Sequence, residues 1–174
     1  MAWKVDPKLS KIEFQVKHLK VTTVRGQFAN FEGTLHMDEE TPPASQVEGI
    51  VEGASVNTGL GLRDLSLKAA SFFDVKQFPH MHFRSTEIGP FEGDDRFKVH
   101  GDLTIRDVTR PVVFHVEDKG ELPPVAGRRR RAFEASLVLN RKDYDLKWPL
   151  LQELGGLLVE DRVEGVLDIH LLEE

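Results

Sequence analysis

Residues 97–105 read FKVHGDLTI, and this stretch decides the fold. Apolar residues or glycine stand at every second position from Phe97 to Ile105, and lysine, histidine, aspartate and threonine occupy the positions between them. A period of two is typical of a β-strand with one apolar face, because successive side chains point to opposite sides. The stretch therefore predicts a strand that buries one face and presents the other to water.

The same pattern recurs along the chain and predicts eight strands. They are residues 12–17, 31–38, 47–56, 81–86, 97–105, 112–116, 133–140 and 163–171. Antiparallel strands with one apolar face bury it either in a two-sheet sandwich or in a closed barrel. An eight-stranded barrel is just wide enough to be filled by side chains or to hold one small ligand.

Two segments depart from this period. Residues 61–70 carry Leu62, Leu65 and Ala69 at helical spacing, which predicts a short helix. Residues 150–158 form an irregular apolar stretch that we interpret as a loop or a lid, since two adjacent glycines oppose a long helix. Without an internal repeat or linker, the 174 residues are expected to form a single domain, residues 1–174.

Composition argues against several classes of function. The net charge of −6 opposes general nucleic-acid binding, which needs a positive field. The absence of cysteine excludes disulfides and thiolate metal sites. Neither a Gly-x-Ser-x-Gly elbow nor a glycine-rich phosphate loop is present. The sequence therefore predicts a protein that is not an enzyme, with no catalytic residues, no metal and no cofactor.

The amino terminus lacks the apolar core of a signal peptide, and no later stretch reaches the roughly 20 apolar residues that span a bilayer. We expect a cytoplasmic protein without stable membrane insertion, or a periplasmic one if a signal segment has been removed.

Three polar groups leave alternatives open. His80 and His82 share one face of a strand and could share a metal, but without a third ligand in the sequence we interpret them as rim histidines. The run from Arg128 to Arg131 either keeps a strand entry soluble or attracts phosphates or a membrane surface. Arg63 and Asp64 form either an exposed ion pair or the polar anchor of an amphiphilic ligand.

A further set of sequence blocks follows one another in a specific order and spacing. They are residues 3–6, 10–14, 16–19, 24–28, 63–64, 72–75, 78–79, 83–86, 101–105, 108–110, 140–144 and the terminal strand. In these blocks the chain resembles the YceI-like family of lipocalin-like, polyisoprenoid-binding proteins. It departs from the family pattern where Leu9 and Ser66 replace histidines and where Asp145 and Glu160 replace glycines, and the missing histidine at position 66 puts any histidine chemistry in doubt.

The resemblance implies an extended eight-stranded antiparallel barrel with an apolar cavity, a homodimer, and a polyisoprenoid lipid as partner. Strand alternation and the phenylalanines after the helix predict the residues that line the lipid tail. These are Phe14, Val16, Phe28, Phe72, Phe73, Phe78, Phe83, Val99, Leu103, Phe114, Phe133 and Leu137. The candidates for the head group are Lys17, His18, Arg25, Arg63 and Asp64.

Two other functions compete with this binding protein. One is an enzyme acting on an isoprenoid lipid, for example a metal-assisted hydrolase that uses His80 and His82. The other is a structural or stress-response protein whose barrel interior is fully packed. A third metal ligand beside the histidines favours the first alternative, and an interior filled to contact favours the second.

Overall fold

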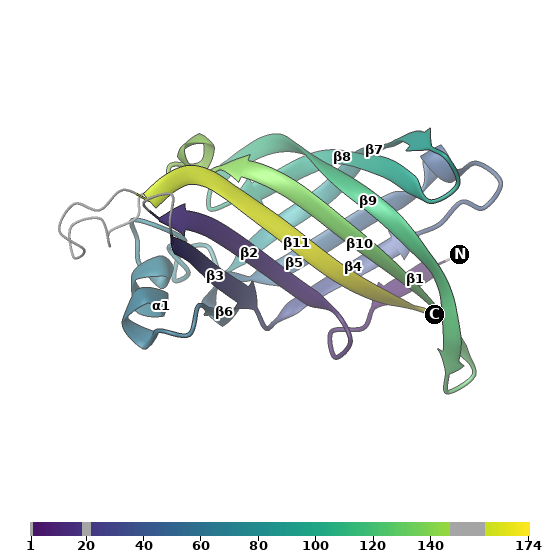
Figure 1. The fold of residues 1–174 in the computed structure, drawn as a ribbon, viewed down its shortest axis with the longest axis horizontal. Helices are drawn as coiled ribbons and strands as arrows, with labels where there is room; N and C mark the ends of the chain where they lie inside the picture. Colours follow the sequence, from purple (N-terminus) through teal and green to yellow (C-terminus); the bar gives the residue numbers. More distant parts are fainter. Residues whose placement is uncertain (1, 19–21, 147–158) are drawn as a thin grey trace.

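The computed structural model describes residues 2–18, 22–146 and 159–174, and Figure 1 shows their arrangement. The strands, in chain order, are β1 (Ala2–Val5), β2 (Lys11–His18), β3 (Thr22–Phe28), β4 (Phe31–His36), β5 (Gln46–Glu52), β6 (Val56–Asn57), β7 (His80–Glu92), β8 (Arg96–Ile105), β9 (Val108–Val125), β10 (Arg128–Asn140) and β11 (Val159–Glu173). The helices are α1 (Gly61–Lys68) and the short 3-10 helices η1 (Pro42–Ala44), η2 (Gly53–Ser55) and η3 (Arg141–Tyr144). The loop or lid predicted at residues 150–158 lies outside the described residues.

The strands form one antiparallel sheet that closes on itself. Its order is β1-β4-β5-β7-β8-β9-β10-β11, and β11 returns to β1 through the pairing of Trp3 with Glu173 and of Val5 with Leu171. Strands β1 and β2 both lie along β11 and run in the same direction, so they are two parts of one interrupted strand. Strands β3 and β4, and β5 and β6, make two further interrupted strands. The wall thus has eight strands, which confirms the predicted eight-stranded antiparallel barrel.

Side chains and backbone groups complete the hydrogen bonding where these strands are interrupted. Between β1 and β2, the backbone N–H of His170 donates to Ser10 Oγ at 2.9 Å, and this hydroxyl donates to the carbonyl of His170 at 3.4 Å. At the other two breaks, Glu52 N donates to Asn30 O and Ala29 N donates to Ser55 O. The wall therefore bends at these points while its backbone groups keep partners.

The inside of the barrel is apolar along its length, in three clusters. The helix-end cluster contains Leu67, Phe72, Phe73, Phe28 and Val16; the central cluster contains Phe83, Ile88, Val99, Val112 and Leu137; the terminal cluster contains Trp3, Leu35 and Leu171. Leu103 and Leu139 pack against both of the first two clusters, and Val47 packs against the second and the third. Apolar contact therefore runs from one end of the barrel to the other.

Glycines on the inner face make room for large side chains from the paired strands. A Cβ atom added at Gly26 would lie 2.4 Å from Cζ of Phe14, and one added at Gly165 would lie 2.4 Å from Cδ2 of Leu137. Gly101 is tighter still, because its Cβ would meet the ring of Phe83 at 2.4 Å and the carbonyl oxygen of Arg84 at 2.5 Å. The glycines of the alternating pattern are thus the positions over which interior side chains lie.

The predicted helix is present as α1, but its leucines are arranged in an unexpected way. Leu67 is fully buried at 0% exposure, whereas Leu62 and Leu65 are exposed. Figure 1 shows α1 at one end of the barrel, and of its leucines only Leu67 belongs to the helix-end cluster. The spacing of Leu62, Leu65 and Ala69 therefore indicated the helix correctly without marking its buried face.

Replacing Gly101 by alanine is expected to destabilise the protein by about 1–3 kcal/mol, since the new methyl group would meet a backbone oxygen that cannot move aside. Gly49 is the matched control: it also lies on an inner face, opposite Phe83, and its added Cβ meets nothing closer than 3.7 Å. Urea unfolding of Gly101→Ala and Gly49→Ala measures the difference. Equal unfolding free energies would contradict the close packing of Phe83 over Gly101.

Candidate functional site

The inner face of the barrel is the largest apolar surface that the fold constructs. Residues paired across antiparallel strands point to the same side, so the pairs Val99–Phe114 and Phe14–Gly26 show which face is inside. Phenylalanines dominate this face and meet in edge-to-face contacts, such as Phe83 with Phe114 at 4.9 Å between ring centroids. Most of the eleven phenylalanines of the sequence thus lie inside the barrel.

Several of these inward side chains are only partly buried. Phe114, Leu103 and Leu139 point into the barrel and belong to the central cluster, yet each keeps part of its surface accessible. A side chain that faces the inside of a closed wall stays accessible only where its neighbours do not fill the space. These positions of the inner face are therefore not fully covered by their neighbours, and Leu139 is among the residues that line a hollow in the wall.

The helix end of the barrel is closed by apolar residues that α1 and the turn after it bring in. Leu67, Phe72 and Phe73 pack onto Phe28 and Val16 of the wall. Rings of Phe28 and Phe73 lie 5.9 Å apart, and those of Phe72 and Phe73 lie 4.7 Å apart. This end of the barrel is therefore covered by side chains from one short segment and not by strands.

Hydrogen bonds to Thr58 fasten the start of α1. Asp64 Oδ1 accepts from the backbone N–H of Thr58 at 2.9 Å and from its hydroxyl at 2.5 Å. Arg63 donates to Thr58 through Nε and Nη2, at 2.8 Å to the hydroxyl oxygen and 2.8 Å to the carbonyl. Arg63 and Asp64 do not form an isolated ion pair, because both are organised around Thr58.

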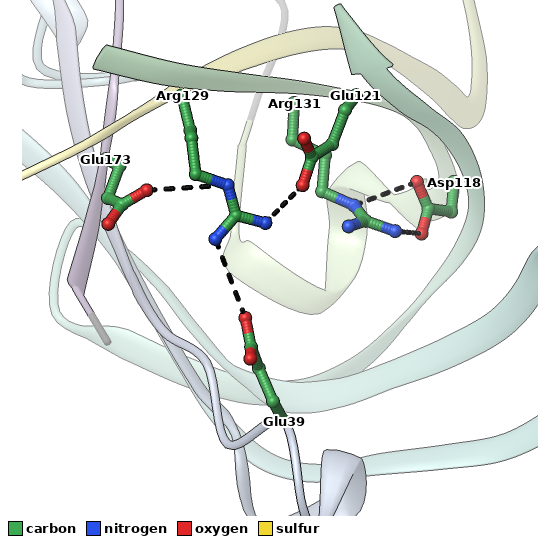
Figure 2. A network of polar contacts seen from close by, with 6 residues as sticks. All are labelled: Glu39, Asp118, Glu121, Arg129, Arg131 and Glu173. Atoms are coloured by element: carbon green, nitrogen blue, oxygen red, sulfur yellow. Dashed lines mark hydrogen bonds and ion pairs between the residues drawn. The ribbon is translucent and has the colours of Figure 1, made fainter. Parts of the chain in front are cut away.

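The opposite end of the barrel carries a charged network, shown in Figure 2. Arg131 forms a two-point contact with Asp118, at 3.2 Å through Nε and 2.5 Å through Nη2. Arg129 contacts Glu121, Glu173 and Glu39, and its guanidinium group lies 5.5 Å from the centre of the Trp3 ring. Trp3 below it is 1% exposed. The network therefore covers the terminal cluster with charge.

Ion pairing in this network holds the charges in place. The hydrogen bond from Arg129 lowers the pKa of Glu121, and the same contact raises the pKa of Arg129. Arg128 donates through Nε to the carbonyl oxygen of Glu173 at 2.9 Å. Arg129 and Arg131 thus each pair with carboxylates of the same chain. This role differs from the two that the sequence left open for the run from Arg128 to Arg131, which were to keep a strand entry soluble or to attract phosphates or a membrane surface.

The wall opens between β9 and β10. Their pairing ends at Ser136 and His115. Beyond this pair, a hollow of about 320 Å³ lies between the first residues of β9 and the last residues of β10. Its lining includes the interior residues Val112 and Leu139 and the buried Tyr144 of η3. Arg110 on one rim donates to the carbonyl oxygen of Asp143 on the other at 3.2 Å. Interior apolar residues are therefore reachable from the side of the barrel at this opening.

Eleven of the twelve residues predicted to line the tail belong to the three interior clusters, and Phe78 is the exception. The interior clusters also contain residues that the sequence analysis did not predict to line the tail. These are Ile12, Val47, Met81, Val112, Val116, Leu139, Val163, Leu167 and Ile169. Period-two alternation within each strand is the signal that would have included most of them.

The predicted head-group residues are not brought together. Lys17 and Arg25 point outward, because their neighbours Val16 and Val24 are the inward pair of β2 and β3. Arg63 and Asp64 lie on α1 at the helix end. The side chain of His18 lies outside what the structure describes.

His80 and His82 lie on the outer surface of the wall, because Met81 between them points inward. Nε2 of His82 contacts Glu48 Oε1 at 2.8 Å, and this contact lowers the pKa of Glu48. Within residues 2–18, 22–146 and 159–174, no group of three His, Cys, Asp or Glu side chains is arranged to hold a metal ion. The two histidines therefore face away from the lumen.

Fold and site together define a class of protein: a closed antiparallel barrel with an apolar lumen, a helix at one end and a charged network at the other. None of the described helices is long and apolar enough to cross a membrane. The model of the YceI-like domain matches residues 3–171, and the chain belongs to this family. The blocks from Trp3 to the terminal strand had indicated the same family.

Relatives and solved structures agree with this assignment. The UPF0312 protein plu2095 of Photorhabdus laumondii is 35% identical over 158 residues, covering 89% of this chain and 80% of the relative. A UPF0312 protein of Yersinia pestis is 34% identical over the same length and shares.

Among solved structures, BcnA of Burkholderia cenocepacia has a TM-score of 0.78 at 22% identity, covering 98% of this chain and 99% of that one. A polyisoprenoid binding domain of Saccharophagus degradans has a TM-score of 0.73 at 16% identity, covering 99% and 98%. At these identities the two structures establish the shared fold.

Tyr144 offers a direct test of the packing beside the wall opening, because it is the one tyrosine in the sequence. Burial, and secondarily the charge of Asp143, raise its pKa from 10.0 to about 12. Absorbance titration of the folded protein is expected to show tyrosinate forming near pH 12. A midpoint near 10 would show that the hydroxyl is solvated.

The same shift has a consequence for stability. Between pH 10 and 12 the unfolded chain loses the Tyr144 proton and the folded chain keeps it, so the unfolding free energy falls as pH rises, by at most about 1.4 kcal/mol per pH unit. In Tyr144→Phe this part of the decline is expected to disappear. Other groups titrate equally in both proteins, so their difference in urea unfolding isolates Tyr144.

Proposed function

We propose that the protein binds a long-chain polyisoprenoid lipid, an isoprenoid quinone or a polyprenyl pyrophosphate, in the lumen of its barrel. The observation that carries this proposal is the continuous apolar inner face, where some large side chains, such as Phe114 and Leu103, stay partly accessible. The fold shared with a polyisoprenoid binding domain supports the choice of lipid. The protein would act as a carrier, a store or a sensor of that lipid.

The energetics favour an apolar chain as the ligand. Burying one CH₂ group contributes about 0.8 kcal/mol, so each five-carbon unit contributes roughly 3 kcal/mol before the costs of binding. A few buried units are enough for tight binding without any specific polar contact. Phenylalanine, valine and leucine walls suit such a tail because it tolerates imprecise contacts.

Binding explains the interior better than catalysis does. Catalysis on a bound lipid needs an acid, a base or a metal ligand that reaches the reacting atoms. His80 and His82, the residues of the alternative hydrolase, are on the outer surface. The carboxylates and guanidinium groups of the terminal network pair with one another above Trp3. We therefore propose a binding protein rather than an enzyme.

The head group is proposed to remain at the helix end, outside the apolar lumen, because burying an unpaired phosphate is very costly. Arg63 is the cation of the predicted head-group set that lies on α1 beside Leu67 and the phenylalanine cover. A guanidinium group suits a pyrophosphate through charge-assisted hydrogen bonds, whereas a quinone needs only a neutral donor.

Phe83→Asp is expected to abolish lipid uptake, because it places an unpaired charge in the central cluster. Val166→Asp is the control, since Val166 is on the outer wall of β11 and 48% exposed. Displacement of a fluorescent polyprenyl probe and native mass spectrometry for co-purified lipid are the two measurements. The milder Leu103→Gln variant tests the same lumen if Phe83→Asp fails to fold. Normal uptake by a folded Phe83→Asp or Leu103→Gln variant would refute the interior site.

Arg63→Ala is expected to weaken pyrophosphate-headed ligands about tenfold or more, the effect of losing one charge-assisted hydrogen bond, and to leave quinones nearly unchanged. Arg25→Ala, on the outer face of β3, is the matched control and should change neither affinity. Both variants are compared in one displacement assay with two ligands. If Arg63→Ala leaves both ligands unchanged, the head group lies elsewhere, and Arg131→Ala at the other end becomes the next variant.

A further inference from the structure

We infer that α1 docks the protein on the surface of a phospholipid membrane, with Leu60, Leu62 and Leu65 entering the bilayer interface. The inference deepens the proposed function, because it names the partner from which the lumen would take its lipid or to which it would return it. Three observations carry it: exposed leucines, their place on the barrel and the charges around them.

The leucines are exposed to an unusual degree for such large apolar side chains. Leu60 is 57% exposed, Leu62 79% and Leu65 64%, and all three come from six consecutive residues. Single exposed apolar residues are normal on protein surfaces, but a cluster of large ones marks an interaction site. Only Leu67 of this helix is directed into the barrel.

The place of α1 connects this surface to the lumen. Figure 1 shows the helix at the end of the barrel, away from the two chain termini. Its buried Leu67 packs with Phe72 and Phe73, which cover the helix end of the apolar interior. One short segment therefore contributes an apolar surface on the outside and the apolar cover of the lumen on the inside. The charged network with Arg129 lies at the opposite end.

Charges near the leucines suit phospholipid head groups. Between residues 57 and 78 there are two acidic side chains: Asp74 is buried, and Asp64 is partly exposed and accepts hydrogen bonds from Thr58. Lys68 lies one helical turn from Leu65 and is partly exposed, and Lys76 in the segment after α1 is exposed. The segment thus carries accessible cations on and after the helix that bears its leucines, although the whole chain has a net charge of −6. Apolar side chains flanked by lysines are typical of surfaces that lie in the membrane interface.

A second copy of the chain fits this surface less well. A stable protein interface buries about 800 Å² on each partner, with a fully enclosed apolar centre. Leu62 and Leu65 on the eight-residue α1, with Leu60 just before it, supply much less than that area. Shallow insertion needs no complementary surface, since each leucine gains separately by leaving water.

The first experiment measures binding of the full-length protein to vesicles by flotation. Vesicles of phosphatidylcholine alone and of phosphatidylcholine with phosphatidylglycerol are compared. We expect the unmodified protein to float with both and more strongly with the anionic vesicles. Leu62→Asp combined with Leu65→Asp should reduce the bound fraction at least tenfold. Val138→Asp combined with Val166→Asp, on the exposed outer wall, is the matched control and should bind as the unmodified protein does.

Failure to bind either kind of vesicle would overturn the inference, and so would undiminished binding by the Leu62 and Leu65 double variant. Circular dichroism checks that each variant is folded. Replacing Lys68 and Lys76 by glutamine adds an independent test, because it should weaken binding to the anionic vesicles and leave binding to phosphatidylcholine unchanged. An equal effect on both vesicles would refute the role of charge complementarity.

Two further measurements distinguish membrane docking by α1 from lipid binding in the lumen and from dimerisation. Titration of geranylgeranyl pyrophosphate and of an isoprenoid quinone without vesicles tests the lumen alone: if the unmodified protein floats but binds neither probe, the proposed function fails and docking stands. If either probe binds and vesicles do not, docking fails and the proposed function stands. Light scattering reports the mass in solution, and a dimer that dissociates in the Leu62 and Leu65 double variant would assign the leucines to an interface between copies.

Discussion

The pairing of β1 with β11 is the constraint on which the rest of the structure depends. Trp3 and Val5 meet Glu173 and Leu171 across this seam, so the two ends of the chain close the sheet into a barrel. Closure removes the open edges that a long antiparallel sheet would otherwise expose to other chains. It also turns one face of every strand into a lumen that water reaches only through the ends or through a gap in the wall.

A closed wall of eight strands leaves little room inside, and the inner face shows how that room is divided. Gly26, Gly101 and Gly165 lie under large side chains from other strands, while Phe114 and Leu103 keep part of their surface accessible. Small residues opposite large ones set the local width of a barrel. An apolar chain is the kind of ligand that such a narrow, uneven space can hold, because it can bend around each side chain.

The two ends of the barrel differ in chemistry, and this difference gives the molecule a direction. At the terminal end, Arg129 and Arg131 pair with carboxylates, Arg129 over the buried Trp3 and Arg131 over Phe133. At the helix end, Leu67 and the following phenylalanines cover the lumen with apolar side chains. Moving an apolar ligand past paired charges requires breaking their contacts, whereas moving it past an apolar cover exchanges one apolar contact for another. Of the two ends, the helix end is therefore the one we propose for exchange of the ligand.

The sequence by itself determined the number of wall strands and most of the inner face, because a period of two is a local property that each strand carries alone. Residues such as Val99 and Leu137 could be assigned to the inside before any pairing was known. Only the tertiary structure decided which elements meet: that Arg129 and Arg131 contact carboxylates from other segments, and that Leu62 and Leu65 stay exposed. Helical spacing predicted α1 but not its buried face, because the buried face of a helix depends on the element that packs against it. At the end of the barrel, α1 packs against the wall through Leu67 alone of its leucines.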